Sequence, residues 1–119
     1  MDDPAVPARA RRVLAQLRAP YGVYATLGSP PVDGRETTPA LFEGLNIRLL
    51  RDELAVLTLA GGRKLSLLGL DCEHDLPSDL SAFKALISLA PADSMRILLY
   101  HSPELMPQVQ QYPLDLDLC

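Results

Sequence analysis

The first part of the chain alternates between a helical apolar stripe and a strand-like run. Four apolar residues recur at the spacing of one helix face, with arginines on the other faces: Ala10, Val13, Leu14 and Leu17. Pro20 ends this predicted helix because proline has no N–H for the helical ladder. Residues 22–27 are β-branched and aromatic, which predicts a short buried strand. Prolines flanked by glycines then predict a loop over residues 28–34.

The middle of the chain is rich in strand-like runs. Thr38 and Pro39 open a short helix that Gly44 ends. Three apolar runs follow it along the chain: residues 47–50, 54–60 and 64–70. The Gly-Gly pair at residues 61–62 is a strong signal for a hairpin between the second and third runs. We therefore expect an antiparallel meander of local hairpins over residues 47–70.

A longer helix and a buried strand occupy the C-terminal half. Ser78 is the predicted cap of this helix, and its apolar face carries Leu80, Phe83, Ile87 and Ala90. Residues 95–100 form an apolar, partly β-branched run that stops abruptly at His101, which is typical of a buried strand. Residues 114–119 alternate like a further strand. Together these patterns predict a single α/β domain over residues 1–119.

Composition and charge narrow the class of partner and compartment. The 119 residues are 48% hydrophobic and 22% charged, which is typical of a globular chain. A net charge of −4 argues against nucleic acid or an anionic membrane as the main partner. No apolar run approaches the ~20 residues that span a bilayer. Cys72 and Cys119 lack the paired spacing of a zinc knuckle. We expect a soluble chain in a reducing, cytoplasmic compartment.

His101 is the best single candidate for chemistry because it directly follows a predicted buried strand. Ligand and metal sites of open α/β sheets lie past the carboxyl ends of strands, and a neutral imidazole is a common metal ligand. The alternative is a structural histidine whose nitrogens bond to the backbone. The polar loop at residues 71–75 is a further candidate metal site or simply a solvated loop, since neighbouring side chains there point apart. The prolines at residues 30–31 exclude a phosphate-cradling loop.

Four stretches carry a resemblance to a known family: residues 17–28, 47–71, 96–104 and 115–119. They resemble the calcineurin-like metallophosphoesterases, in particular the bacterial, often membrane-associated subgroup. Residues 17–28 resemble the segment leading to that family's Gly-Asn-His-Asp motif, and residues 47–71 resemble the segment after it. Residues 96–104 are similar to the strand that ends in a metal-ligating histidine, and residues 115–119 to the strand before Gly-His-x-His. The resemblance covers most of the chain but only the centre of a typical family member.

The resemblance implies a fold and a metal site. The fold would be a layered α/β sandwich of mixed sheets flanked by helices, a fragment of the family's four-layer α-β-β-α architecture. The site would bind two divalent ions of the manganese, iron or zinc type and hydrolyse a phosphoester. His101 matches a ligand position. Ser29 stands where the family has an asparagine ligand, and Pro30 stands where it has the histidine that assists the leaving group. No catalytic residue is therefore assigned.

The resemblance also implies missing parts. The family's first two motifs would lie upstream of Met1, and its last would begin after Cys119. One histidine cannot hold two dications, so we expect no stably bound metal and no phosphoesterase activity from this chain alone. The alternative is a non-catalytic binding or interaction module derived from the same fold. Exposed sheet edges would favour self-association.

Overall fold

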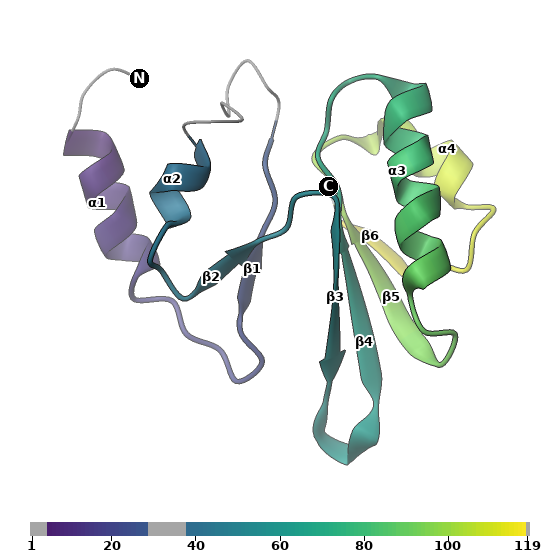
Figure 1. The fold of residues 1–119 in the computed structure, drawn as a ribbon, viewed down its shortest axis with the longest axis horizontal. Helices are drawn as coiled ribbons and strands as arrows, with labels where there is room; N and C mark the ends of the chain where they lie inside the picture. Colours follow the sequence, from purple (N-terminus) through teal and green to yellow (C-terminus); the bar gives the residue numbers. More distant parts are fainter. Residues whose placement is uncertain (1–4, 29–37, 119) are drawn as a thin grey trace.

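The computed structural model describes residues 5–28 and 38–118 (Figure 1). Its helices and single 3-10 turns are α1 (Ala5–Leu14), α2 (Thr38–Phe42), η1 (Ala60–Gly62), α3 (Leu76–Leu89), η2 (Pro103–Leu105) and α4 (Met106–Val109). Its strands are β1 (Val23–Ala25), β2 (Ile47–Leu49), β3 (Glu53–Thr58), β4 (Lys64–Gly69), β5 (Ser94–Leu99) and β6 (Leu116–Leu118). The predicted α/β class is confirmed, since the described part is a small domain with two open sheets, a parallel pair of strands and a mixed sheet of four. None of its helices is long and apolar enough to cross a membrane.

The two sheets differ in the number of their strands and in how these strands pair. One contains β1 and β2, paired in parallel, and the other has the order β3-β4-β5-β6. In the larger sheet β3 and β4 form the predicted antiparallel hairpin, while β4, β5 and β6 run parallel. The predicted meander over residues 47–70 is therefore wrong in its first strand. β2 pairs with β1 rather than β3 because α2 lies between β1 and β2 and returns the chain in the same direction.

Helices lie on the outer sides of the two sheets. In Figure 1, α1 and α2 are on the side of β1 and β2, and α3 and α4 are on the side of the four-stranded sheet. Alternate residues of β4 and β5 point to opposite faces of that sheet, so each strand contributes to two apolar clusters.

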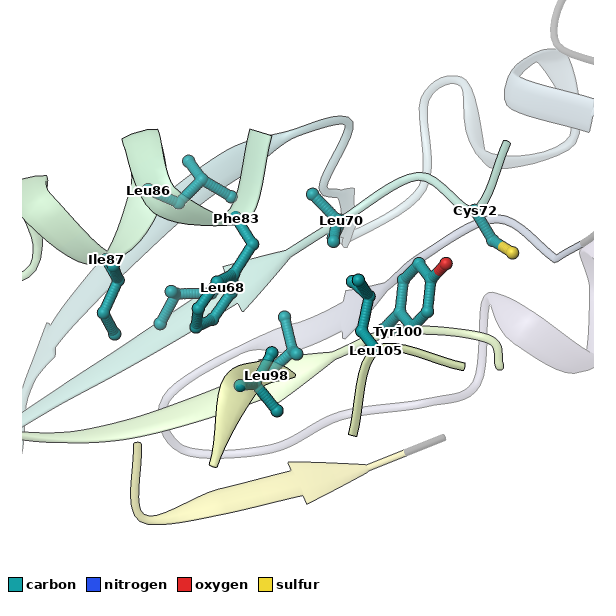
Figure 2. Close-up of a cluster of buried hydrophobic side chains, with 10 residues drawn as sticks. Leu68, Leu70, Cys72, Phe83, Leu86, Ile87, Leu98, Tyr100 and Leu105 are labelled. Carbon is teal, nitrogen blue, oxygen red and sulfur yellow. The ribbon is translucent and has the colours of Figure 1, made fainter. Parts of the chain in front are cut away.

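The larger apolar cluster fills the space between the four-stranded sheet and its helices (Figure 2). Its buried members are Leu68, Leu70, Cys72, Phe83, Leu86, Ile87, Leu98, Tyr100, Leu105 and Val109. The smaller cluster lies on the opposite face, where Leu50, Ala55 and Leu67 are buried and Tyr24 of β1 packs against them. This smaller cluster joins the two sheets.

Gly69 allows the two sheets to approach closely. A Cβ added at Gly69 would overlap the Cβ of Leu50 and lie 2.9 Å from its Cδ1. Leu50 is fully buried, and its amide donates to the carbonyl of Ala25 at 2.8 Å. The residue after β2 therefore fills the space above a position of β4 that has no side chain.

Two helix predictions need correction at their ends. α1 ends at Leu14 rather than near Pro20, because the amides of Gln16 and Leu17 bond three residues back and tighten the chain into a turn. Val13 is 64% exposed, so the predicted apolar stripe is only partly covered. α3 begins at Leu76 with Asp75 as its N-cap, and Ser78 instead donates to the Asp75 carboxylate.

Candidate functional site

A pocket of about 400 Å³ lies where the carboxyl ends of β1 and β5 come together. Its walls come from both sheets and comprise Tyr24, Ala25, Thr26, Leu27, Gly28, Leu99, Tyr100, His101 and Leu118. The carboxyl ends of strands are where open α/β sheets commonly bind ligands. The end of β1 and the predicted candidate His101 therefore line the same pocket.

His101 is exposed at this pocket. Its imidazole forms no hydrogen bond or ion pair with any residue that the structure describes. No backbone group of the described residues bonds to this imidazole, as the alternative of a structural histidine would need. A neutral imidazole has one ring nitrogen with a free lone pair, which can bind a metal ion.

Tyr100, the residue before His101, is anchored in the core. Its hydroxyl donates to Oδ2 of Asp79 at 2.6 Å, and that carboxylate also accepts from the amide of Glu73 at 3.2 Å. Figure 2 shows the Tyr100 hydroxyl turned toward Cys72. Burial and then the hydrogen bond to Asp79 raise the pKa of Tyr100, so the phenol stays protonated. Since side chains alternate along an extended chain, an anchored Tyr100 directs His101 to the opposite side.

The loop before α3 is also tied to the segment that follows His101. His74 has a φ of 55°, an uncommon value for a residue other than glycine. Its Nδ1 lies 3.4 Å from Oε1 of Glu104 in η2, and both ring nitrogens lie 3.8 Å from Sγ of Cys72. Ser102 accepts a hydrogen bond from the amide of Glu104 and caps η2. The chain on both sides of His101 is therefore held.

Asp71 forms a partly buried ion pair that fixes the other end of the same loop. Nε of Arg51 lies 2.8 Å from Oδ2 and 3.1 Å from Oδ1 of Asp71. The Asp71 amide donates to Oδ1 of Asp52, whose pKa is raised mainly by burial. Asp71 thus points to Arg51, Cys72 points into the core and His74 points toward η2. The side chains of the neighbours Asp71 and Cys72 thus point apart, whereas those of Cys72 and His74, two residues apart, lie close together.

Across residues 5–28 and 38–118 there is no group of three or more histidine, cysteine, aspartate or glutamate side chains that could hold an ion. His101 supplies one donor, whereas a two-metal centre needs several. Ser29 and Pro30 lie outside the described residues, although Gly28 directly before them lines the pocket.

No family model, curated protein or solved structure matches this chain. The resemblance to metallophosphoesterases therefore rests on the stretches quoted above, and the site rests on its own geometry.

The sequence patterns did not identify Asp79, whose carboxylate accepts the hydrogen bond that holds Tyr100 beside the pocket. Asp79 is only 3% exposed, although it is an acid in the first turn of a helix. A signal was present, because Asp79 falls on the apolar face of α3 between Leu76 and Phe83. An acid on a buried face needs donors, but nothing in the spacing identifies Tyr100 as the donor.

Proposed function

We propose that this chain carries part of a metal-dependent phosphoesterase site in which His101 is a ligand of a divalent metal ion. One observation carries the proposal: the exposed imidazole of His101, without a partner among the described residues, in a pocket at the carboxyl ends of β1 and β5. In the family that the chain resembles, ligand motifs follow both of these strands. The pocket brings the same two segments together.

The finer description of the fold belongs to the same proposal. We infer a fragment of a four-layer α-β-β-α architecture, with mixed sheets in the two inner layers. The arrangement in Figure 1 supports this inference, since α1 and α2 lie outside one sheet and α3 and α4 outside the other. Packing of Tyr24 and Leu50 against Leu67 supports direct contact between the two inner layers.

We assign no catalytic step to this chain alone. The described residues offer a single candidate ligand, and hydrolysis by two metal ions needs carboxylates that bridge and position them. The side chain of Pro30 cannot donate a proton to a leaving group. Further ligands would have to come from outside the described residues, and the chain on its own is expected not to hydrolyse phosphoesters.

Manganese(II) titration of the ¹⁵N-labelled chain tests the ligand role. The paramagnetic ion should first broaden the amide signals of residues 26–28 and 101, because these line one pocket. The broadening should disappear in His101→Ala and persist in His74→Ala, the matched control on the neighbouring loop. Broadening that survives His101→Ala, or that centres on residues 71–75, would overturn the proposal.

A chromogenic phosphodiester with added manganese tests the expected lack of activity. Turnover should not exceed that of the buffer with metal. Hydrolysis that His101→Ala abolishes would refute the claim of inactivity, although it would support the ligand role. Equal hydrolysis by wild type and His101→Ala would point to a contaminant.

A non-catalytic binding module is the other candidate function. The apolar side chains that line the pocket favour it: Leu27, Leu99 and Leu118. This function predicts that an apolar fluorescent probe binds the native chain and that His101→Ala leaves its affinity unchanged. Competition between manganese and the probe in wild type, but not in His101→Ala, would instead favour the metal site.

A further inference from the structure

β6 forms an edge of the four-stranded sheet in the described part of the chain. It pairs in parallel with β5. The amide of Tyr100 donates to the carbonyl of Leu118 at 3.0 Å, so Leu118 directs its backbone toward β5. Successive residues of a strand direct their backbone groups to opposite sides, and those at an edge present unpaired donors and acceptors. The N–H and C=O of Asp117 therefore face outward.

The side chains of β6 divide between the two faces of the sheet. Leu116 and Leu118 are 44% and 48% exposed on one face. Asp117 lies opposite Leu98 on the face that the helices cover. Both carboxylate oxygens of Asp117 are buried, and neither has a hydrogen-bond partner among the described residues. Burial raises the pKa of this carboxyl, which fits a charge separated from water and from donors.

Arg96 is the buried cation on the same face, but its guanidinium is directed elsewhere. It donates to the carbonyl of Ala90 at 2.9 Å and to that of Pro113 at 3.2 Å. Its own backbone amide donates to Asp115, two residues before Asp117. Its Nε has no acceptor among the described residues, yet Arg96 and Asp117 do not form an ion pair. The Asp117 carboxylate thus lacks a donor from its own sheet.

We propose that the open edge of β6 docks an extended segment of a partner protein in which a lysine or arginine stands between apolar residues. Such a segment would pair with the outward backbone groups of Asp117 and cover Leu116 and Leu118 with its apolar side chains. Its basic side chain would lie beside Asp117 on the other face and give the carboxylate a donor. The proposed edge shares Leu118 with the pocket beside His101, but the proposal does not depend on the phosphoesterase proposal.

A second copy of the chain is a poorer occupant of the same edge. Two-fold antiparallel pairing of β6 with itself would place Asp117 opposite Asp117, and like charges directly opposite each other destabilise a strand pair. The Leu-Asp-Leu sequence of β6 instead matches a partner strand with a positive charge between two apolar residues.

Peptide titration of the full 119-residue chain tests this proposal. The probes are two acetylated and amidated peptides with apolar, β-branched residues around a central lysine or a central norleucine. The lysine peptide should shift the ¹⁵N–¹H signals of residues 116–118 and bind about ten- to a hundredfold more tightly, the range for one hydrogen bond to a charged group. In Asp117→Asn this preference should vanish, and in Leu118→Ala both peptides should bind more weakly.

Three results would overturn the proposal. The first is that neither peptide moves the signals of residues 116–118 at millimolar concentration. The next is that the lysine and norleucine peptides bind wild type equally. The last is a dimer in sedimentation whose concentration dependence shifts these same signals, which would make a second copy the occupant. Circular dichroism of Asp117→Asn and Leu118→Ala confirms that both variants are folded before they are compared.

Discussion

Replacing Gly69 with alanine tests how tightly the two sheets are joined. The added methyl group would overlap the Cβ of Leu50, an atom fixed to the backbone that no rotamer change can move away. Inserting a methyl group into a filled core costs about 1–3 kcal/mol, and a glycine-to-alanine change within a strand returns about 0.5–1 kcal/mol. Because the overlap is with a fixed atom, we take the upper end and expect a net loss of about 2 kcal/mol.

Urea unfolding followed by circular dichroism measures this loss. The matched control is Gly61→Ala in η1, where an added Cβ meets no atom within 4 Å. Gly61 has a φ of 85°, so alanine there costs about 1 kcal/mol through the backbone alone. If Gly69→Ala is as stable as wild type, the sheets separate around a methyl group without penalty. The close approach of Leu50 would then not contribute to stability.

Three further predictions concern single side chains. His101→Ala should change the free energy of unfolding by no more than about 0.5 kcal/mol, because an exposed side chain without bonds contributes little; a larger loss in urea would make the imidazole structural. Tyr100→Phe should lower the free energy of unfolding by about 1.5–3 kcal/mol, since it removes the 2.6 Å hydrogen bond to buried Asp79. Tyr112→Phe is the control, and an equal loss of stability in both variants would refute this prediction. Burial raises the pKa of Asp117 above its ordinary 3.8. The protonated carboxyl therefore stabilises the folded state fully below pH 3.8, and this contribution is lost as pH rises through the folded-state pKa. The urea midpoint of Asp117→Asn should therefore rise relative to that of wild type as pH rises. A difference between the two midpoints that does not change with pH would contradict this sign.

The sequence predicted the strands of this fold better than their partners. The unbroken apolar run at residues 95–100 and the Gly-Gly pair at residues 61–62 correspond to β5 and to the turn between β3 and β4. Periodicity reports whether a segment is buried on one face or two, but it carries no information about which strand lies beside it. β2 was therefore assigned to the wrong neighbour, because its pairing depends on where α2 returns the chain.

The candidate site, too, could be predicted from the sequence only in part. His101 was predicted at a strand end from the residues around it, and the structure has it there at a pocket. That its imidazole has no partner among the described residues, and that Tyr100 bonds to Asp79 beneath it, depends on contacts between distant segments. Short-range patterns do not encode such contacts. The family resemblance, its two-metal site and its substrate stay predictions.

The pocket takes one wall from each sheet, and this links ligand affinity to partial unfolding. β1 is attached to the four-stranded sheet through the smaller apolar cluster around Leu50, whereas β4 and β5 are covered by the larger one. Proteins open in cooperative units, and those with fewer buried contacts open at lower free energy. Opening of the β1–β2 unit would leave α3 and the larger cluster intact but abolish the pocket. The apparent affinity of any occupant then falls in proportion to the closed fraction. Substitutions at Leu50 or Ala55 would thereby alter affinity without touching the ligand.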